Sequence, residues 1–164
     1  MAKRPNEVIV ESITEALFLL MKDQDFSRIT ITDITKKAGV GRVSFYRNFD
    51  SKEDVIQKYL DRITLEFKNN LHIDQIRDNH RLYVSAIFNH LGQHKELITM
   101  LNAAGLLHII KQEFDRAFLT LKSERLPESV CYMTAGAYYN LLYYWMNNGF
   151  NETPGELSKL KFSL

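Results

Sequence analysis

Apolar residues recur at every third or fourth position through almost the whole chain of 164 residues, and the strict alternation that marks a strand is absent. The first apolar stripe predicts a helix from Asn6 or Glu7 to Lys22. After a polar connector at 72–78, the same spacing predicts five more helices, over 79–91, 95–103, 105–123, 127–148 and 154–162. The pattern therefore predicts an all-α protein.

Two capping patterns predict where helices begin between the first helix and the connector at 72–78. Thr30 stands three residues before Asp33, and Ser51 stands three residues before Asp54. Apolar residues at helical spacing follow each pair. A Gly-Val-Gly turn at 39–41 and a short helical segment lie between the two patterns. A glycine-containing turn of this length joins two short helices at a steep angle.

This order of elements predicts two domains. We expect a three-helix domain over 1–50 and a helical domain over 51–164, whose first helix, at about 51–70, links the two. Apolar residues make up 45% of the chain and charged residues 25%, as in ordinary globular proteins. The single cysteine excludes a disulfide framework and a cysteine-based zinc site. We therefore expect a reducing, cytoplasmic location.

One stretch resembles a membrane span in length. The 23 residues between Glu128 and Glu152 carry no charge, and that length can cross a bilayer. The stretch also contains asparagines and five tyrosines, whose polar groups are costly in hydrocarbon. We interpret it as a buried helix and predict no association with a membrane.

Cations are concentrated in one part of the chain. The net charge is only +1, which excludes a protein that is basic over its whole surface. Residues 34–49 nevertheless hold four cations and no acid: Lys36, Lys37, Arg42 and Arg47. A short helix that also carries Ser44 and Tyr46 can meet a phosphate backbone and base edges. Spacing and charge leave two interpretations open, a helix-turn-helix reader of the DNA major groove and a solvated charge run.

The run from Thr30 to Asp54 resembles the DNA-binding signature of the TetR/AcrR transcriptional regulators. The similarity covers about residues 6–60, and the features in register are the Ala38-Gly39-Val40 turn, the Phe45-Tyr46-x-x-Phe49 pair and Ser51-Lys52-Glu53-Asp54. The chain departs from the family at Thr35, where alanine is usual, and at 23–26, where a Gly-Tyr pair is usual. Neither departure lies on the expected reading surface.

The resemblance implies a helix-turn-helix domain that binds double-stranded DNA. Thr30 would cap a helix whose N-terminus approaches a phosphate, while Tyr46 and Lys52 would contact phosphates directly. Arg47 contacts either a base or a phosphate. Phe45 and Phe49 would form the core behind the reading helix. The DNA-contact residues carried over are Thr30, Lys37, Arg42, Val43, Ser44, Tyr46, Arg47 and Lys52.

A dimer is expected from the second half. The helix at 127–148 is apolar on all sides, so several of its sides must be covered. A second copy of the chain is the simplest cover, because soluble oligomers are most often two-fold dimers. The alternative is a central helix of a monomeric bundle. The predicted interface residues are Tyr132, Gly136, Tyr139, Tyr143, Leu157 and Leu160.

The resemblance also implies a small-molecule effector that binds in the second domain. An apolar wall with a few polar groups is the mark of such a site, and His108 and Tyr138 are the candidate polar groups. The alternative for each of these residues is plain core. The predicted lining residues are Phe88, Met100, Leu107, His108, Phe114, Phe118 and Tyr138.

No metal or cofactor is predicted. His90 and His94 have the helical spacing of metal ligands, but no suitable carboxylate lies one turn away. A second cluster lies in the connector and consists of His72, Asp74, Asp78 and His80. Neither set is interpreted as a metal site. The chain lacks a glycine-rich phosphate loop, an HExxH motif and a nucleophile elbow, so no enzyme is predicted.

We therefore predict a sequence-specific, DNA-binding transcriptional regulator. Two reading heads on a two-fold axis match a palindromic operator. In the resembling family such a dimer is usually a repressor, and a small-molecule effector releases it from DNA. The alternative is a helical interaction module of the same fold that senses a protein partner.

Overall fold

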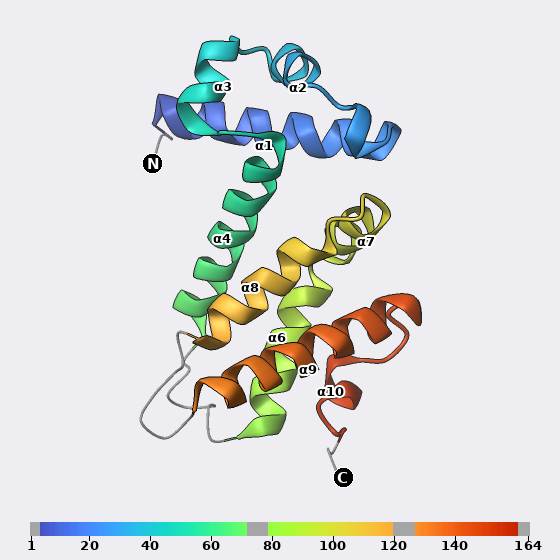
Figure 1. The fold of residues 1–164 in the computed structure, drawn as a ribbon. Coiled ribbons are helices and arrows are strands. Elements are labelled where there is room, and N and C mark those ends of the chain that lie inside the picture. Colours follow the sequence, from blue (N-terminus) through green and yellow to red (C-terminus); the bar gives the residue numbers. More distant parts are fainter. Residues whose placement is uncertain (1–3, 72–78, 120–126, 161–164) are drawn as a thin grey trace. The chain divides into compact units, whose positions relative to one another are not determined.

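The structure is a computed structural model that describes residues 4–71, 79–119 and 127–160 (Figure 1). Every regular element within these ranges is a helix, which confirms the predicted all-α fold class. The chain forms two compact units, Met1–Arg62 and Ile63–Leu164. Each unit is described by itself below.

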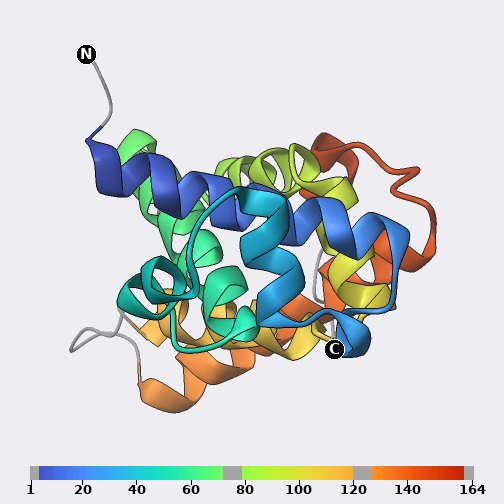
Figure 2. The same cartoon turned by 90° about the horizontal axis from the view of Figure 1, so that it is seen from above.

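The first unit is built around one long helix. It contains α1 (Pro5–Asp23), the 3-10 helix η1 (Phe26–Arg28), α2 (Ile31–Ala38), α3 (Arg42–Asn48) and the first part of α4 (Lys52–Asn70). Helix α1 packs against both α2 and α3 (Figure 2). The fully buried side chains are Ile13, Leu17, Ile34, Phe45, Val55 and Ile56. This core holds the two short helices in place.

Local signals set the ends of these helices. Thr30 and Asp33 form the predicted capping box at the start of α2, in which the side chain of each accepts a hydrogen bond from the backbone N–H of the other. Gly39 ends α2 with φ +67°, a left-handed conformation that glycine adopts without a Cβ penalty. The Ser51 hydroxyl accepts a hydrogen bond from the Asp54 N–H at 3.1 Å, as its spacing predicts. The segment between α1 and α2 contains η1, in which the Phe26 side chain is buried.

The unit boundary falls inside α4, after Arg62, rather than at the predicted position between residues 50 and 51. Val55 and Ile56 are fully buried and Leu60 is nearly so, and all three belong to the first unit. The capping pattern marks where a helix begins. It carries no information on which core the first turns of that helix join.

The second unit is a helical bundle. Beyond the end of α4 it contains α6 (His80–Gly92), α7 (Lys95–Ala103), α8 (Leu107–Leu119), α9 (Glu128–Asn147) and α10 (Pro154–Leu157). Helices α8 and α9 lie side by side, and α10 packs against α6 (Figure 1). None of the described helices, α9 included, is long and apolar enough to cross a membrane.

Two helices differ from the predicted ranges by two residues or more at one end. Helix α8 begins at Leu107 rather than at residue 105, because Gly105 has φ +72° and belongs to the turn after α7. Helix α10 ends at Leu157, whereas the prediction ran to residue 162. The N–H groups of Lys159 and Leu160 bond three residues back, to the Glu156 and Leu157 carbonyls, which tightens the last turn and ends the helix. The predicted connector at 72–78 lies outside the described residues, as does the predicted end of the 105–123 helix.

Candidate nucleic-acid interface

Helix α3 separates an inner from an outer face. Phe45 is fully buried and Phe49 nearly so, and their ring centroids lie 5.7 Å apart. On the outer face Val43 is 73% exposed and Tyr46 is 52% exposed. An isopropyl group left so open contributes little to packing within the described chain. The two aromatic anchors therefore hold α3 while Val43 and Tyr46 point into solvent.

The arginines of α3 lie on the same outer face. Arg42 and Arg47 are exposed, and neither forms an ion pair with a residue that the structure describes. The Arg42 guanidinium lies 6.0 Å from the centroid of the Tyr46 ring. Elsewhere the chain pairs exposed cations with acids, as Lys58 with Asp54 at 2.9 Å and Lys111 with Asp115 at 2.6 Å. The two arginines and the exposed valine between them form a surface that can contact another molecule.

Ser44 lies on the edge of this surface. It is half-buried, and its carbonyl accepts a hydrogen bond from the Asn48 amide at 2.8 Å. That bond uses the Ser44 backbone and leaves the hydroxyl available. The structure thus brings Arg42, Val43, Ser44, Tyr46 and Arg47 together on one short helix.

Thr30 is exposed at the start of α2, but its own polar groups are already engaged. The Thr30 hydroxyl and N–H both donate to Asp33 Oδ2, at 2.6 and 2.9 Å. These two hydrogen bonds hold the pKa of the Asp33 carboxyl below its usual value, because they stabilise the charged form. Lys37, in the last turn of α2, is exposed and forms no ion pair with a described residue.

Lys52 does not lie open like the other predicted phosphate contacts. Its ammonium donates to three backbone carbonyls, those of Phe26 at 2.5 Å, Ile29 at 2.9 Å and Ser27 at 3.4 Å. It also lies 4.3 Å from the centroid of the Phe26 ring. These contacts cross from α4 to the connector before α2. No local sequence signal indicates a partner so far away along the chain.

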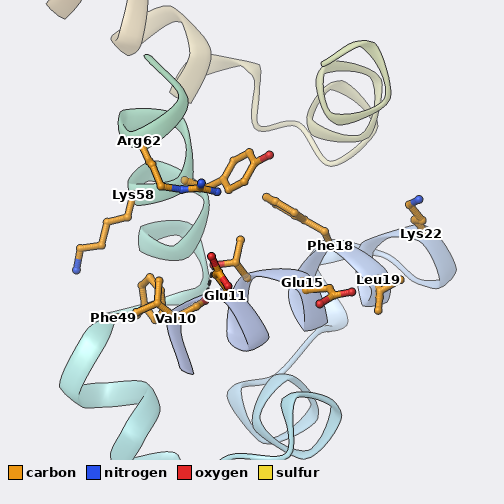
Figure 3. A pocket seen from close by; sticks show the side chains of 11 residues that line it. Val10, Glu11, Glu15, Phe18, Leu19, Lys22, Phe49, Lys58 and Arg62 are labelled. Atoms are coloured by element: carbon orange, nitrogen blue, oxygen red, sulfur yellow. Dashed lines mark hydrogen bonds between the residues drawn. The ribbon is translucent and has the colours of Figure 1, made fainter. Parts of the chain in front are cut away.

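A separate hollow of about 490 Å³ lies between α1 and α4 in the first unit. Figure 3 shows its side chains, which include Phe18, Glu11 and Arg62. The Phe18 and Tyr59 rings meet edge to face with centroids 4.9 Å apart, and the Arg62 guanidinium lies 5.1 Å from the Tyr59 centroid. None of the eight predicted DNA-contact residues, all of which the structure describes, lines this hollow.

Most of the residues predicted to line an effector site form an aromatic core in the second unit. The Tyr138 ring stacks on Phe118 with centroids 5.1 Å apart, and it lies 6.5 Å from the Phe88 ring. Tyr83, which the sequence analysis missed, meets Tyr138 edge to face at 6.3 Å. Burial raises the pKa of the Tyr83 phenol to about 12 and also raises that of Tyr138.

The other predicted lining residues differ in whether they are buried or exposed. Leu107 and Phe114 are buried, and Met100 is half-buried. His108 is exposed, and its Nδ1 lies 3.3 Å from the Gly105 carbonyl oxygen. The placement of His108 among the lining residues is therefore corrected. Leu107 faces the core at the start of α8. Successive residues of a helix point in different directions, so His108 faces solvent.

A hollow of about 410 Å³ in the second unit lies between the end of α4 and α6. Its described lining includes Glu66, Phe67, His90 and His94, and none of the seven predicted effector residues. The His90 ring stacks on Phe67, with centroids 4.5 Å apart, and meets His94 at 5.0 Å. Burial and the neighbouring His94 lower the pKa of His90 to about 4. No group of three metal-ligating side chains occurs among the described residues.

The predicted dimer residues lie partly on an open surface of α9. Tyr132 and Tyr143 are both 48% exposed, while Gly136 and Tyr139 are half-buried. Leu160 is exposed as well. Leu157 is only 2% exposed and belongs to the core of its own chain, so its place in the predicted interface is corrected. It is buried because α10 packs on α6.

Helix α9 also exposes apolar residues that are not among the predicted interface residues. Met133 is exposed, and so is Tyr144. The Tyr144 hydroxyl donates to the Glu152 carboxylate at 2.6 Å, which raises the pKa of this phenol. The sequence shows that apolar residues lie on every side of this helix. It does not show which of them are exposed to solvent in the folded chain.

The first unit has the parts of a helix-turn-helix protein. Helix α2, the Gly39 turn and the exposed cationic helix α3 follow one another in the order of that motif. Residues 13–59 match the sequence profile of the bacterial regulatory proteins of the tetR family. This part of the chain is therefore similar to the tetR family, as the resemblance predicts.

Two bacterial relatives share this part of the chain. The uncharacterized HTH-type transcriptional regulator YxbF of Bacillus subtilis (strain 168) is 37% identical over 57 residues, which are 35% of this chain and 15% of that protein. The HTH-type transcriptional regulator AlkX of Mycobacterium tuberculosis (strain ATCC 25618 / H37Rv) is 28% identical over 71 residues, 43% of this chain and 34% of that protein. The chain thus spans about a third or less of the length of these relatives.

Proposed function

We propose that the chain is a sequence-specific DNA-binding regulator whose α3 enters the major groove. The observation that carries the proposal is the outer face of α3, where Arg42 and Arg47, which have no ion-pair partner among the described residues, flank exposed Val43. Arginines suit guanine edges and phosphates, and an exposed apolar side chain suits a thymine methyl. Val43 is 73% exposed and is therefore available for such a contact.

Phosphate contacts would fix α3 in the groove. Lys37 is exposed and unpaired within the described chain, and the Tyr46 hydroxyl lies on the exposed side of α3. The Thr30 hydroxyl is engaged by Asp33. Backbone N–H groups in the first turn of α2 would therefore make the phosphate contact at this end of the helix. These contacts position the protein, and the residues of α3 supply the base preference.

The active form in this proposal is a homodimer on a palindromic operator. Tyr132, Tyr143 and Leu160 leave large apolar groups in solvent, and aromatic residues are enriched in interface cores. No described atom lies within 4 Å of a Cβ added at Gly136, so a second helix can come close there. A two-fold dimer presents two copies of α3 to two half-sites.

The regulator would act as a cytoplasmic repressor that a small-molecule effector releases. The support is the match of residues 13–59 to the tetR family together with the buried aromatic cluster around Tyr138 in the second unit. Phe88, Phe114 and Phe118 belong to that cluster, and Met100 and Leu107 are the remaining residues proposed for the lining. An effector shifts the equilibrium only by its difference in affinity between the DNA-bound and free states.

Selection from a random double-stranded DNA library tests the proposal. The purified full chain is incubated with the library at moderate salt, and the bound DNA is sequenced after enrichment. A palindromic consensus is the expected result. The variant Arg42→Ala should lose enrichment, whereas Lys111→Ala, which removes a paired cation of α8, should retain it.

The remaining outcomes each exclude part of the proposal. A single half-site without a palindrome would exclude the dimer while leaving DNA reading intact. A chain that is folded and enriches no sequence would overturn DNA recognition and favour the interaction module that senses a protein partner.

A further inference from the structure

We propose that Lys52 is a positioning residue that fixes the start of α2, and that it acts from inside the first unit without contacting DNA. This inference rests on the proposed DNA-binding function. Its basis is the set of three carbonyls, from Phe26, Ser27 and Ile29, that surround the Lys52 ammonium. An ammonium has three N–H donors, so these contacts occupy all of them.

The three carbonyls belong to the short connector between α1 and α2. Phe26 and Ile29 anchor this connector by their buried side chains. The carbonyls at the end of a helical turn carry partial negative charge and need donors. Lys52 supplies those donors from the first residue of α4, and the Phe26 ring beneath the ammonium adds a cation–π contact at 4.3 Å. The ammonium therefore joins the connector to α4.

The connector leads directly into the phosphate-facing end of α2. Ile29, whose carbonyl accepts from Lys52 at 2.9 Å, immediately precedes the N-cap residue Thr30. A shift of this carbonyl moves the N-cap and with it the first turn of α2. Lys52 thus acts through the position of α2, and its charge is directed at the connector rather than at a phosphate.

A salt titration of operator affinity separates this role from a phosphate contact. Each phosphate contact that a substitution removes should reduce the slope of log K against log salt by about 0.9. We expect Lys52→Met to weaken binding about tenfold, the equivalent of one charge-assisted hydrogen bond, at every salt concentration and with an unchanged slope. The matched control Lys37→Met, which removes an exposed lysine of α2, should reduce the slope.

A second variant keeps the test decisive if Lys52→Met fails to fold. In Lys52→Arg the charge is retained, but a planar guanidinium cannot direct donors at three carbonyls around one point. The positioning role predicts that Lys52→Arg also loses affinity, with the slope unchanged. Full affinity in Lys52→Arg together with a reduced slope in Lys52→Met would overturn the proposal, because both are the behaviour of a phosphate contact.

Hydrogen exchange tests the same role without DNA. The Ile34 N–H donates to the Thr30 carbonyl in the first turn of α2. Lys52→Arg should speed exchange at Ile34 relative to wild type, and Lys37→Met should not. Unchanged exchange at Ile34 would overturn the positioning role. If wild type enriches no DNA sequence, the proposed function fails, and this measurement still decides the role of Lys52.

Discussion

Substitution of Gly39 measures what the turn of the helix-turn-helix requires. Gly39 has φ +67°, and a Cβ added there meets no described atom within 4 Å. Gly39→Ala therefore introduces backbone strain without a steric clash. A left-handed residue other than glycine costs about 1–2 kcal/mol. The reduced entropy of the unfolded chain offsets about 0.4–1 kcal/mol of that. The net destabilisation expected is about 1 kcal/mol.

Two matched variants test this estimate of the cost of backbone strain. Asparagine tolerates the left-handed region, so Gly39→Asn should be milder than Gly39→Ala. Gly136 lies within α9 and is equally open, since a Cβ added there also meets no described atom within 4 Å. There the backbone is helical, and in the monomeric chain, without the proposed partner, Gly136→Ala should stabilise the fold by about 1 kcal/mol. The two alanine variants should thus shift stability in opposite directions.

Urea denaturation can be followed separately in the two units. The single tryptophan, Trp145, is buried in the second unit, so its fluorescence reports that unit. Far-ultraviolet circular dichroism reports the helices of both units. We expect Gly39→Ala to lower the midpoint of the dichroism curve. A midpoint equal to that of wild type would refute the argument from backbone strain.

Three further changes test the interface, the histidine pair and the dimer. Arg42→Ala should lower the affinity for a selected site by about 1–3 kcal/mol and relax the base preference of the protein. Tyr46→Phe should instead weaken binding to selected and random DNA equally. Titration of each variant with both DNAs checks this. The pKa of His90 is lowered to about 4 from 6.5, so the unfolded state binds more protons between these values and stability falls as pH drops through them. In His90→Gln the melting temperature should fall less over that range. Tyr143→Glu should convert the proposed dimer to monomers in sedimentation, and Gln112→Glu, an exposed change on α8, should not.

Local chemistry made much of the first unit predictable. The Thr30 and Ser51 caps and the Gly39 turn depend on residues within a few positions of one another, and the structure confirms each of them. Helix α7, at Lys95–Ala103, has the predicted range as well. Such features are readable because the interacting groups are neighbours in the sequence.

Features that depend on distant partners could not be predicted. Lys52 and Phe26 are 26 positions apart, and nothing in the pattern links them. His108 and Leu107 are adjacent and both suit an apolar wall, but only the rotation of α8 decides that Leu107 faces inward. Leu157 likewise has the spacing of an interface residue, and the packing of α10 on α6 buries it.

The salt dependence of DNA binding depends on which lysines are already engaged. A count along the sequence treats Lys52 like Lys37, although one donates to three carbonyls and the other is open. Four cations of residues 34–49 in each chain of the proposed dimer neutralise about eight phosphates, which predicts a slope of about −7. Inclusion of Lys52 raises the count to about ten and predicts a slope of about −9. A wild-type slope near −9 would contradict the count of eight phosphates. It would also mean that Lys52 leaves its three carbonyls and contacts a phosphate when the protein binds DNA.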